Sequence, residues 1–240
     1  FDISIEADLI EELARVYGYD NLPTQKPQFS FELAPQAEVV STQKIKELLV
    51  CMGYQEAITF SFVDPKLQHI LDPQRPTLSL ANPLSSELST MRTTLWAGLL
   101  NAVAYNQNRQ QGRVRLFEVG SRFLPQADGS LVQEVMLSGV ITGELLPEAW
   151  ANKSPVVDFF DLKGNVESIL ALTGTSDTVR FKTANHPALH TGQTAAVVDS
   201  HDNVIGYLGK LHPQVQQSLD VQGAVYVFEL LLAPLLNAKL

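Results

Sequence analysis

Five carboxylates lie within the first twelve residues and could bind a cation. They are Asp2, Glu6, Asp8, Glu11 and Glu12. Carboxylate oxygens are the ligands that a hard ion such as Mg²⁺ prefers. The same residue types also cap helix starts and form solvated helix faces. The residue types are therefore compatible with three roles, and the choice between them depends on the secondary structure that positions the carboxylates.

Two short elements are predicted to position these carboxylates. Alternating apolar and polar residues over 1–6 indicate a half-buried strand, and apolar spacing over 9–17 indicates an amphipathic helix. Asp8 stands where an N-cap is expected, Glu11 follows it as in a capping box, and Gly18 is placed to end the helix.

The predicted geometry puts the carboxylates on polar faces. Asp8, Glu11 and Glu12 share the helix face opposite the apolar stripe, and Asp2 lies on the polar face of the strand. A capped helix start and a cation site remain compatible interpretations.

Two further groups of side chains could carry chemistry. His186 and His190 have a spacing that would suit a metal pair, but Pro187 lies between them and no third ligand is evident, which favours ordinary loop histidines. The basic residues between 109 and 122 could contact a phosphate backbone or an acidic partner, or could be solvated strand ends. This basic group is Arg109, Arg113, Arg115 and Arg122. The sequence has no Walker loop, dinucleotide fingerprint, paired-cysteine zinc pattern or Gly-x-Ser-x-Gly.

Composition narrows the class of protein. The 240 residues are 45% hydrophobic and 18% charged, which is an ordinary globular balance. The net charge of −9 argues against a whole-domain nucleic-acid interface. Cys51 is the single cysteine, so we expect a reducing, cytoplasmic setting. No apolar run is long enough to predict a membrane span. Because the sequence starts within an amphipathic strand and without Met, we expect a piece of a longer protein.

The remaining periodicity predicts an α+β fold with a largely antiparallel sheet. Residues 24–40 are proline-containing and predict a linker. Turns are expected at Asp64-Pro and Asp72-Pro, and a hairpin at Asp128-Gly129. Helices are expected at 41–52, 93–107, 161–172 and just after His212, and strands at 57–62, 114–124, 131–142, 178–183, 194–199, 203–209 and 225–230.

A series of short motifs in a fixed order resembles the beta subunit of bacterial phenylalanyl-tRNA synthetase over nearly the whole chain. Each motif alone is weak, but the ordered set is specific. The motifs are 1–12, Arg15–Pro23, Gly53–Phe62, Asn82–Glu87 with Met91–Thr93, Leu116–Gly120, Asp161–Gly164, His186-Pro187 with His190, Gly206–Gly209 and Leu211–Pro213.

The resemblance implies a class II synthetase-like domain that has lost catalysis. Residues 1–23 would be the tail of a small helical domain, 24–40 a linker and 41–240 the class II domain. Arg115 and Glu118 stand where the second class II motif is expected, but they are one residue further apart than the usual Arg-x-Glu. The glycine-rich turn and ATP-binding arginine of the third motif are missing after Leu230. We therefore expect no catalytic and no cofactor-binding residue in this chain.

The resemblance also implies partners and a metal. The family joins phenylalanine to its tRNA with ATP and Mg²⁺, in an assembly of two alpha and two beta chains with the chemistry in the alpha subunit. The family's beta subunit binds Mg²⁺ near the alpha subunit. The positions that match this magnesium site are Asp2, Asp8, Glu11 and Glu12. ATP is not expected to bind this chain, and neither DNA nor a membrane is an expected partner. Two alternatives stay open: an RNA-binding module using Arg109–Arg122, and a free-standing metal-dependent enzyme using the N-terminal carboxylates.

Overall fold

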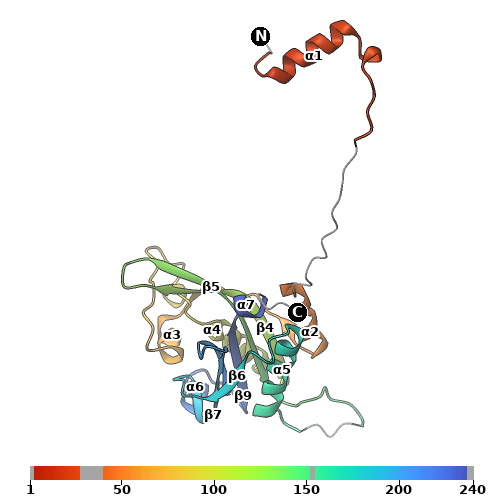
Figure 1. Ribbon diagram of the computed structural model, residues 1–240. Coiled ribbons are helices and arrows are strands. Elements are labelled where there is room, and N and C mark those ends of the chain that lie inside the picture. Colours follow the sequence, from red (N-terminus) through yellow and green to blue (C-terminus); the bar gives the residue numbers. More distant parts are fainter. Residues whose placement is uncertain (1–2, 28–39, 152–154, 237–240) are drawn as a thin grey trace. The chain divides into compact units, whose positions relative to one another are not determined.

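The computed structural model describes residues 3–27, 40–151 and 155–236. The chain divides into two compact units, Phe1–Gln36 and Ala37–Leu240. In the first unit the helix α1 (Glu6–Tyr17) is followed by a short 3₁₀ helix (Tyr19–Asn21) (Figure 1). The described part of the predicted linker, residues 24–27, has no regular structure, and residues 28–39 lie outside the described ranges.

The start of α1 differs from the prediction in its cap. The helix begins after Ile5, which is extended, so Asp8 lies one turn inside the helix. Its Oδ2 accepts hydrogen bonds from the backbone N–H groups of Ser4 at 2.7 Å and Ile5 at 3.0 Å. The predicted N-cap role of Asp8 is therefore wrong, although its carboxylate still satisfies free N–H groups at the helix start. Gly18 ends the helix with a positive φ of 96°, as expected.

The second unit is an α+β domain, as predicted. Its helices are α2 (Thr42–Cys51), α3 (Pro65–Leu71), α4 (Trp96–Gln107), α5 (Phe159–Leu172), α6 (Pro213–Ser218) and α7 (Leu232–Leu236), with a 3₁₀ helix at Ser86–Leu88. Its strands are β1 (Gln55–Glu56), β2 (Phe62–Val63), β3 (Thr90–Met91), β4 (Val114–Pro125), β5 (Leu131–Thr142), β6 (Arg180–Thr183), β7 (Leu189–Val198), β8 (Val204–Leu211) and β9 (Val225–Leu231).

Seven strands form one sheet in the order β1-β4-β5-β9-β8-β7-β6. Only the short β1–β4 pair is parallel, and all other neighbours are antiparallel. The strands β2 and β3 form a separate antiparallel pair.

Helices cover both faces of the sheet (Figure 1). One hydrophobic core lies under α2, α5 and α7, and the other lies under α3, α4 and α6. Because side chains alternate along a strand, Phe117 of β4 enters the first core while its neighbour Leu116 enters the second. We call the sheet face that borders the first core the α5 face, and the sheet face that borders the second core the α4 face.

Most predicted elements are present, but three of them differ from the prediction. No strand is found at residues 3–6. The expected strand at 57–62 is replaced by a segment that leaves the sheet after Glu56 and rejoins a ladder at Phe62. The expected turn at Asp64-Pro is the start of α3, where Asp64 Oδ1 accepts from Lys66 N–H at 2.8 Å. The helix α7 was not predicted. In the described ranges, no helix is both long and apolar enough to cross a membrane.

Candidate functional site

The N-terminal carboxylates do not converge in the described residues. Asp2 lies outside the described ranges, and no group of three metal-ligand side chains is found within them. Hydrogen bonds from the backbone of Ser4 and Ile5 hold the pKa of Asp8 below its usual value. Glu12 is paired with Arg15, whose Nε lies 3.1 Å from its Oε2, and this bond lowers the pKa of Glu12. The donor chemistry suits Mg²⁺, but the described carboxylates do not complete a site.

Arg115 and Glu118 lie on opposite faces of the sheet. Their separation of three residues on one strand produces this result, since only an even spacing keeps two side chains on one face. Arg115 is buried on the α5 face, where its guanidinium donates to the carbonyls of Met52 and Leu145 at 3.3 and 3.1 Å. These two residues cannot act together on one substrate.

Glu118 is instead part of a buried ion pair on the α4 face. Its Oε1 lies 2.7 Å from Arg92 Nη1, and both side chains are only 3% exposed. Thr59 Oγ1 donates to Glu118 Oε2 at 2.7 Å, and Arg92 Nε donates to the carbonyl of Ser121 at 2.8 Å. Gly120 leaves room for this guanidinium, because a Cβ there would lie 2.4 Å from Arg92 Nη2. The pair is thus satisfied by the chain itself.

A row of polar side chains crosses four neighbouring strands on the α4 face. Strand register aligns Glu118 with Ser138, Ser138 with Glu229, and Glu229 with Tyr207. Ser138 Oγ donates to the carbonyl of Phe228 at 2.8 Å. We call these four residues the polar row.

The segment that starts α4 satisfies Glu229. Glu229 Oε1 accepts from Leu95 N–H at 2.7 Å and from Thr94 Oγ1 at 3.0 Å. Its Oε2 lies 3.7 Å from Arg122 Nη1. Burial raises the pKa of Glu229, and the charge of Arg122 opposes that shift.

The space left beside the polar row is small. A cavity of about 120 Å³ is bordered by Glu229, Arg122, Arg75 and His186. Sites for drug-sized ligands usually measure about 300–1,000 Å³. This face of the sheet is therefore filled by the chain's own side chains.

The two histidines do not form a metal pair with a third ligand within the described residues. His186 packs edge-on against Trp96 at 5.0 Å, and burial lowers its pKa to about 4. Its Nδ1 accepts from Ala188 N–H at 3.2 Å, so it serves the loop after Pro187. His190 Nδ1 accepts from Gly192 N–H at 3.1 Å. His186 lies in a loop, as the sequence favoured, whereas His190 lies in β7.

The four basic residues between 109 and 122 do not form one patch. Arg115 is buried on the α5 face, whereas Arg122 lies on the α4 face and bonds Glu134 at 2.7 Å. Arg109 stacks on the ring of Tyr105, with its guanidinium carbon 3.4 Å from the ring centroid. Since most of these charges are already bonded within the chain, they offer little to a phosphate backbone.

An open apolar groove runs between the 57–62 segment, α3 and α4. It has a volume of about 1150 Å³. Ile58 and Phe60 on its rim are 92% and 68% exposed, and Tyr105 of α4 is also exposed. We call this the α3–α4 groove. Exposed apolar surface of this kind marks interaction sites.

Sequence reasoning missed Arg92 and the part played by Glu229. Glu229 is the single charged residue within the apolar run of β9, and that signal could have indicated a buried, paired carboxylate. Arg92 has no such signal, because its partners lie on segments far away in the sequence.

Comparison with known proteins identifies the family. The family described as "Phenylalanyl tRNA synthetase beta chain CLM domain" matches residues 22–232. The chain belongs to this family. Among curated members, the phenylalanine–tRNA ligase beta subunit of Hahella chejuensis is 51% identical over 233 residues, covering 97% of this chain and 29% of the relative. The subunit of Pseudomonas putida is 49% identical over 243 residues, covering 100% of this chain and 30% of the relative.

The family membership agrees with the fold found by structural comparison. The CLM domain resembles a solved pyrrolysyl tRNA synthetase from Desulfitobacterium hafniense with a TM-score of 0.59 and 13% sequence identity. The similarity covers 81% of this chain and 66% of that chain. The expected class II synthetase-like fold is therefore confirmed. The chain spans less than a third of the length of the curated relatives that it matches.

Proposed function

We propose that this chain is the non-catalytic scaffold and interface portion of a phenylalanine–tRNA ligase beta subunit. In this proposal the alpha subunit attaches phenylalanine to its tRNA with ATP, in a cytoplasmic assembly of two alpha and two beta chains. The observation that carries it is the polar row, which is bonded to residues 92–95 and leaves only about 120 Å³ beside it.

Within the described residues, the arginines beside the polar row are already paired with carboxylates, including Arg75, whose Nε lies 3.6 Å from Asp72 Oδ2. A triphosphate requires arginines aimed at one face of the sheet, so that they can stabilise developing charge. Here Arg115 lies on the opposite face from Glu118, and both Arg92 and Arg122 are bound to carboxylates. Neither an RNA-binding module that uses Arg109–Arg122 nor a free-standing metal-dependent enzyme that uses the N-terminal carboxylates gains support from the described residues.

The α3–α4 groove is the surface that fits a partner subunit. Its exposed Ile58 and Phe60 lie on the segment that leaves the sheet, so their apolar side chains are not covered by the described residues of the second unit. We assign the alpha subunit to this groove because the curated relatives are beta subunits.

Phenylalanine-dependent exchange between ATP and pyrophosphate tests the loss of catalysis. The purified chain is expected to give no exchange above a blank, and adding the alpha subunit is expected to give exchange only through that subunit. Phenylalanine-dependent exchange by the chain alone would overturn the proposal.

The magnesium site is a separate part of the proposal. Asp8, Glu11 and Glu12, together with Asp2, would bind Mg²⁺ with further oxygens from water or the alpha subunit. Mn²⁺ can replace Mg²⁺ as a paramagnetic probe, so binding can be read by electron spin resonance without any activity measurement. The complex with the alpha subunit is expected to bind Mn²⁺ more weakly when it carries Glu11→Gln. Equal binding by that variant and by a matched Glu47→Gln control on α2 would contradict the site.

A further inference from the structure

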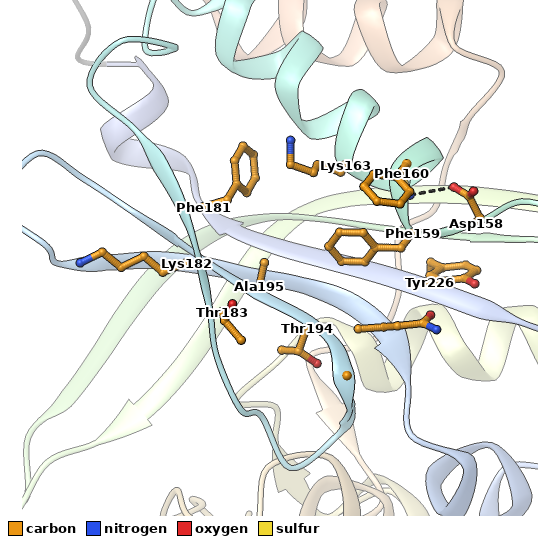
Figure 2. A pocket seen from close by; sticks show the side chains of 12 residues that line it. Asp158, Phe159, Phe160, Lys163, Phe181, Lys182, Thr183, Thr194, Ala195 and Tyr226 are labelled. Carbon is orange, nitrogen blue, oxygen red and sulfur yellow. Dashed lines mark hydrogen bonds between the residues drawn. The ribbon is translucent and has the colours of Figure 1, made fainter.

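A second cavity lies on the α5 face, away from the polar row. It measures about 550 Å³ and opens between the start of α5 and the strands β6, β7 and β9 (Figure 2). This volume falls within the range of small-molecule sites. The residues that matter for its chemistry are Asp158, Phe159, Lys163, Phe181, Gln193 and Tyr226.

Aromatic rings from three elements surround this cavity. Phe159 comes from α5, Phe181 from β6 and Tyr226 from β9, and Figure 2 labels all three rings among the lining residues. Because the three rings come from separate elements, a flat ligand can stack on their faces. Planar aromatic ligands such as nucleobases bind to such surfaces regardless of base identity.

One polar group at the cavity has unmet hydrogen-bonding capacity. Gln193 Oε1 is buried and has no hydrogen-bond partner in the described chain. A buried, unpaired acceptor is costly, and a ligand that donates to it removes that cost. A ligand with N–H or O–H groups at its edge is therefore favoured over a hydrocarbon.

Gln193 lies where the pairing of β7 with β8 is irregular. The register of β7 against β8 shifts between Leu189 and Thr194, and the extra residues are fixed by Thr194 Oγ1, which donates to the carbonyl of His190 at 2.6 Å. The ring of His190 accepts from Gly192 N–H at 3.1 Å. Bulges commonly redirect a side chain next to a functional site.

The charged groups are one lysine and one carboxylate. Lys163 Nζ lies 4.6 Å from the centroid of Phe181, and its ion-pair partner Glu167 is half exposed, so a phosphate can replace that partner. Asp158 Oδ1 accepts from the backbone of Phe160 and Asp161 at 2.7 and 3.0 Å, which leaves Oδ2 for a ligand. A carboxylate oxygen can accept hydrogen bonds from ribose hydroxyls.

We propose that this cavity binds a nucleotide, either free or unpaired within single-stranded RNA. The base stacks between Phe159, Phe181 and Tyr226 while its edge donates to Gln193. The ribose hydroxyls donate to Asp158, and the phosphate pairs with Lys163. This ligand meets the aromatic, neutral polar and charged groups of the cavity together.

Calorimetric titration of the whole chain with AMP, GMP, CMP and UMP tests the proposal. At least one nucleotide is expected to bind saturably with a Kd below about 1 mM. Lys163→Ala and Gln193→Leu are each expected to weaken binding by about tenfold or more. Two control variants are expected to keep it: Glu167→Gln, which frees Lys163, and Lys44→Ala, which removes an exposed lysine on α2.

A second measurement uses the unmodified chain and does not depend on a variant that folds. The nucleoside without phosphate is expected to bind about tenfold more weakly than its monophosphate, because it lacks the partner of Lys163. An eight-residue single-stranded RNA distinguishes the sources: tighter binding than the monophosphate indicates RNA, and equal or weaker binding indicates a free nucleotide. No saturable binding of any nucleotide at about 10 mM, or equal affinity for nucleoside and monophosphate, would overturn the proposal.

Discussion

At the scale of single residues, Arg92 and Glu118 decide what the α4 face can do. Both charges are removed from water, and each is bonded by groups of the same chain. A buried pair of this kind adds little net stability, yet removing one partner leaves an uncompensated charge. The Arg92–Glu118 pair therefore has a structural role and leaves neither charge free to act on a substrate.

Replacing Arg92 with Met is expected to destabilise the fold by about 3–5 kcal/mol, since Glu118 would remain buried and unpaired. Urea denaturation measures this loss. The double variant Arg92→Met with Glu118→Leu is expected to be more stable than the single one. Arg180→Met, which breaks an exposed pair with Asp202, is the matched control and is expected to change nothing measurable. A single variant as stable as the control would contradict this role.

His186 is expected to make stability depend on pH. Burial lowers its pKa from 6.5 to about 4, so between these values the unfolded chain binds a proton that the folded chain excludes. The contribution of neutral His186 to the free energy of unfolding is complete above about pH 6.5 and falls as the pH decreases. Near pH 4 the free energy of unfolding has decreased by at most roughly 3 kcal/mol. The variant His186→Gln should show a flatter dependence of unfolding free energy on pH over this window. His69→Gln, at an exposed position on α3, should retain the slope of the unmodified chain.

At the scale of elements, α3 depends on its first residues. Asp64 accepts from Lys66 N–H and Pro65 occupies the first turn, so the helix of seven residues starts at a defined position. Asp64→Ala is expected to cost about 1 kcal/mol in thermal or urea denaturation, whereas Asp64→Ser should retain most of that stability. Equal loss of stability in Asp64→Ala and Asp64→Ser would show that the N-cap hydrogen bond is not the cause. The start of α3 also matters for the α3–α4 groove, because this helix forms one of its walls.

Local sequence signals predicted the elements better than the contacts between them. The hairpin at Asp128-Gly129 and the helices α2 and α5 follow from turn residues and apolar spacing, which act over a few residues. The same rules failed at Asp64-Pro65, because that dipeptide suits both a turn and a helix start. They failed again at Ile58 and Phe60, whose alternation resembles a strand although both side chains are exposed. An apolar pattern indicates which residues are buried, but it does not indicate whether the same chain or a partner chain buries them.

The candidate site was predictable only in part. The odd spacing of Arg115 and Glu118 was visible in the sequence, and its effect follows directly from strand geometry. Arg92 could not be predicted as the partner of Glu118, because a fold brings together residues 26 positions apart in the sequence. The magnesium ligands stay a prediction, since Asp2 lies outside the described residues.

At the scale of the whole molecule, two surfaces have different expected occupants. The α3–α4 groove is wide and apolar on its rim, which suits a protein partner, whereas the cavity beside α5 is smaller and mixes rings with polar groups. In the proposed function, the alpha subunit covers the apolar side chains of the α3–α4 groove. The central claim is thus that this chain contributes contact surface and no catalysis.

Association with the alpha subunit, measured by size-exclusion chromatography with light scattering, tests that claim most directly. The chain is expected to form a stable complex, and Phe60→Asp should weaken it by about tenfold or more because it places a charge in the apolar interface. Val204→Asp, at an exposed site on β8 outside the groove, should leave the complex intact. A contradiction would be an alpha subunit that assembles with a full-length beta subunit but not with this chain, or a Phe60→Asp chain that binds as tightly as the unmodified one.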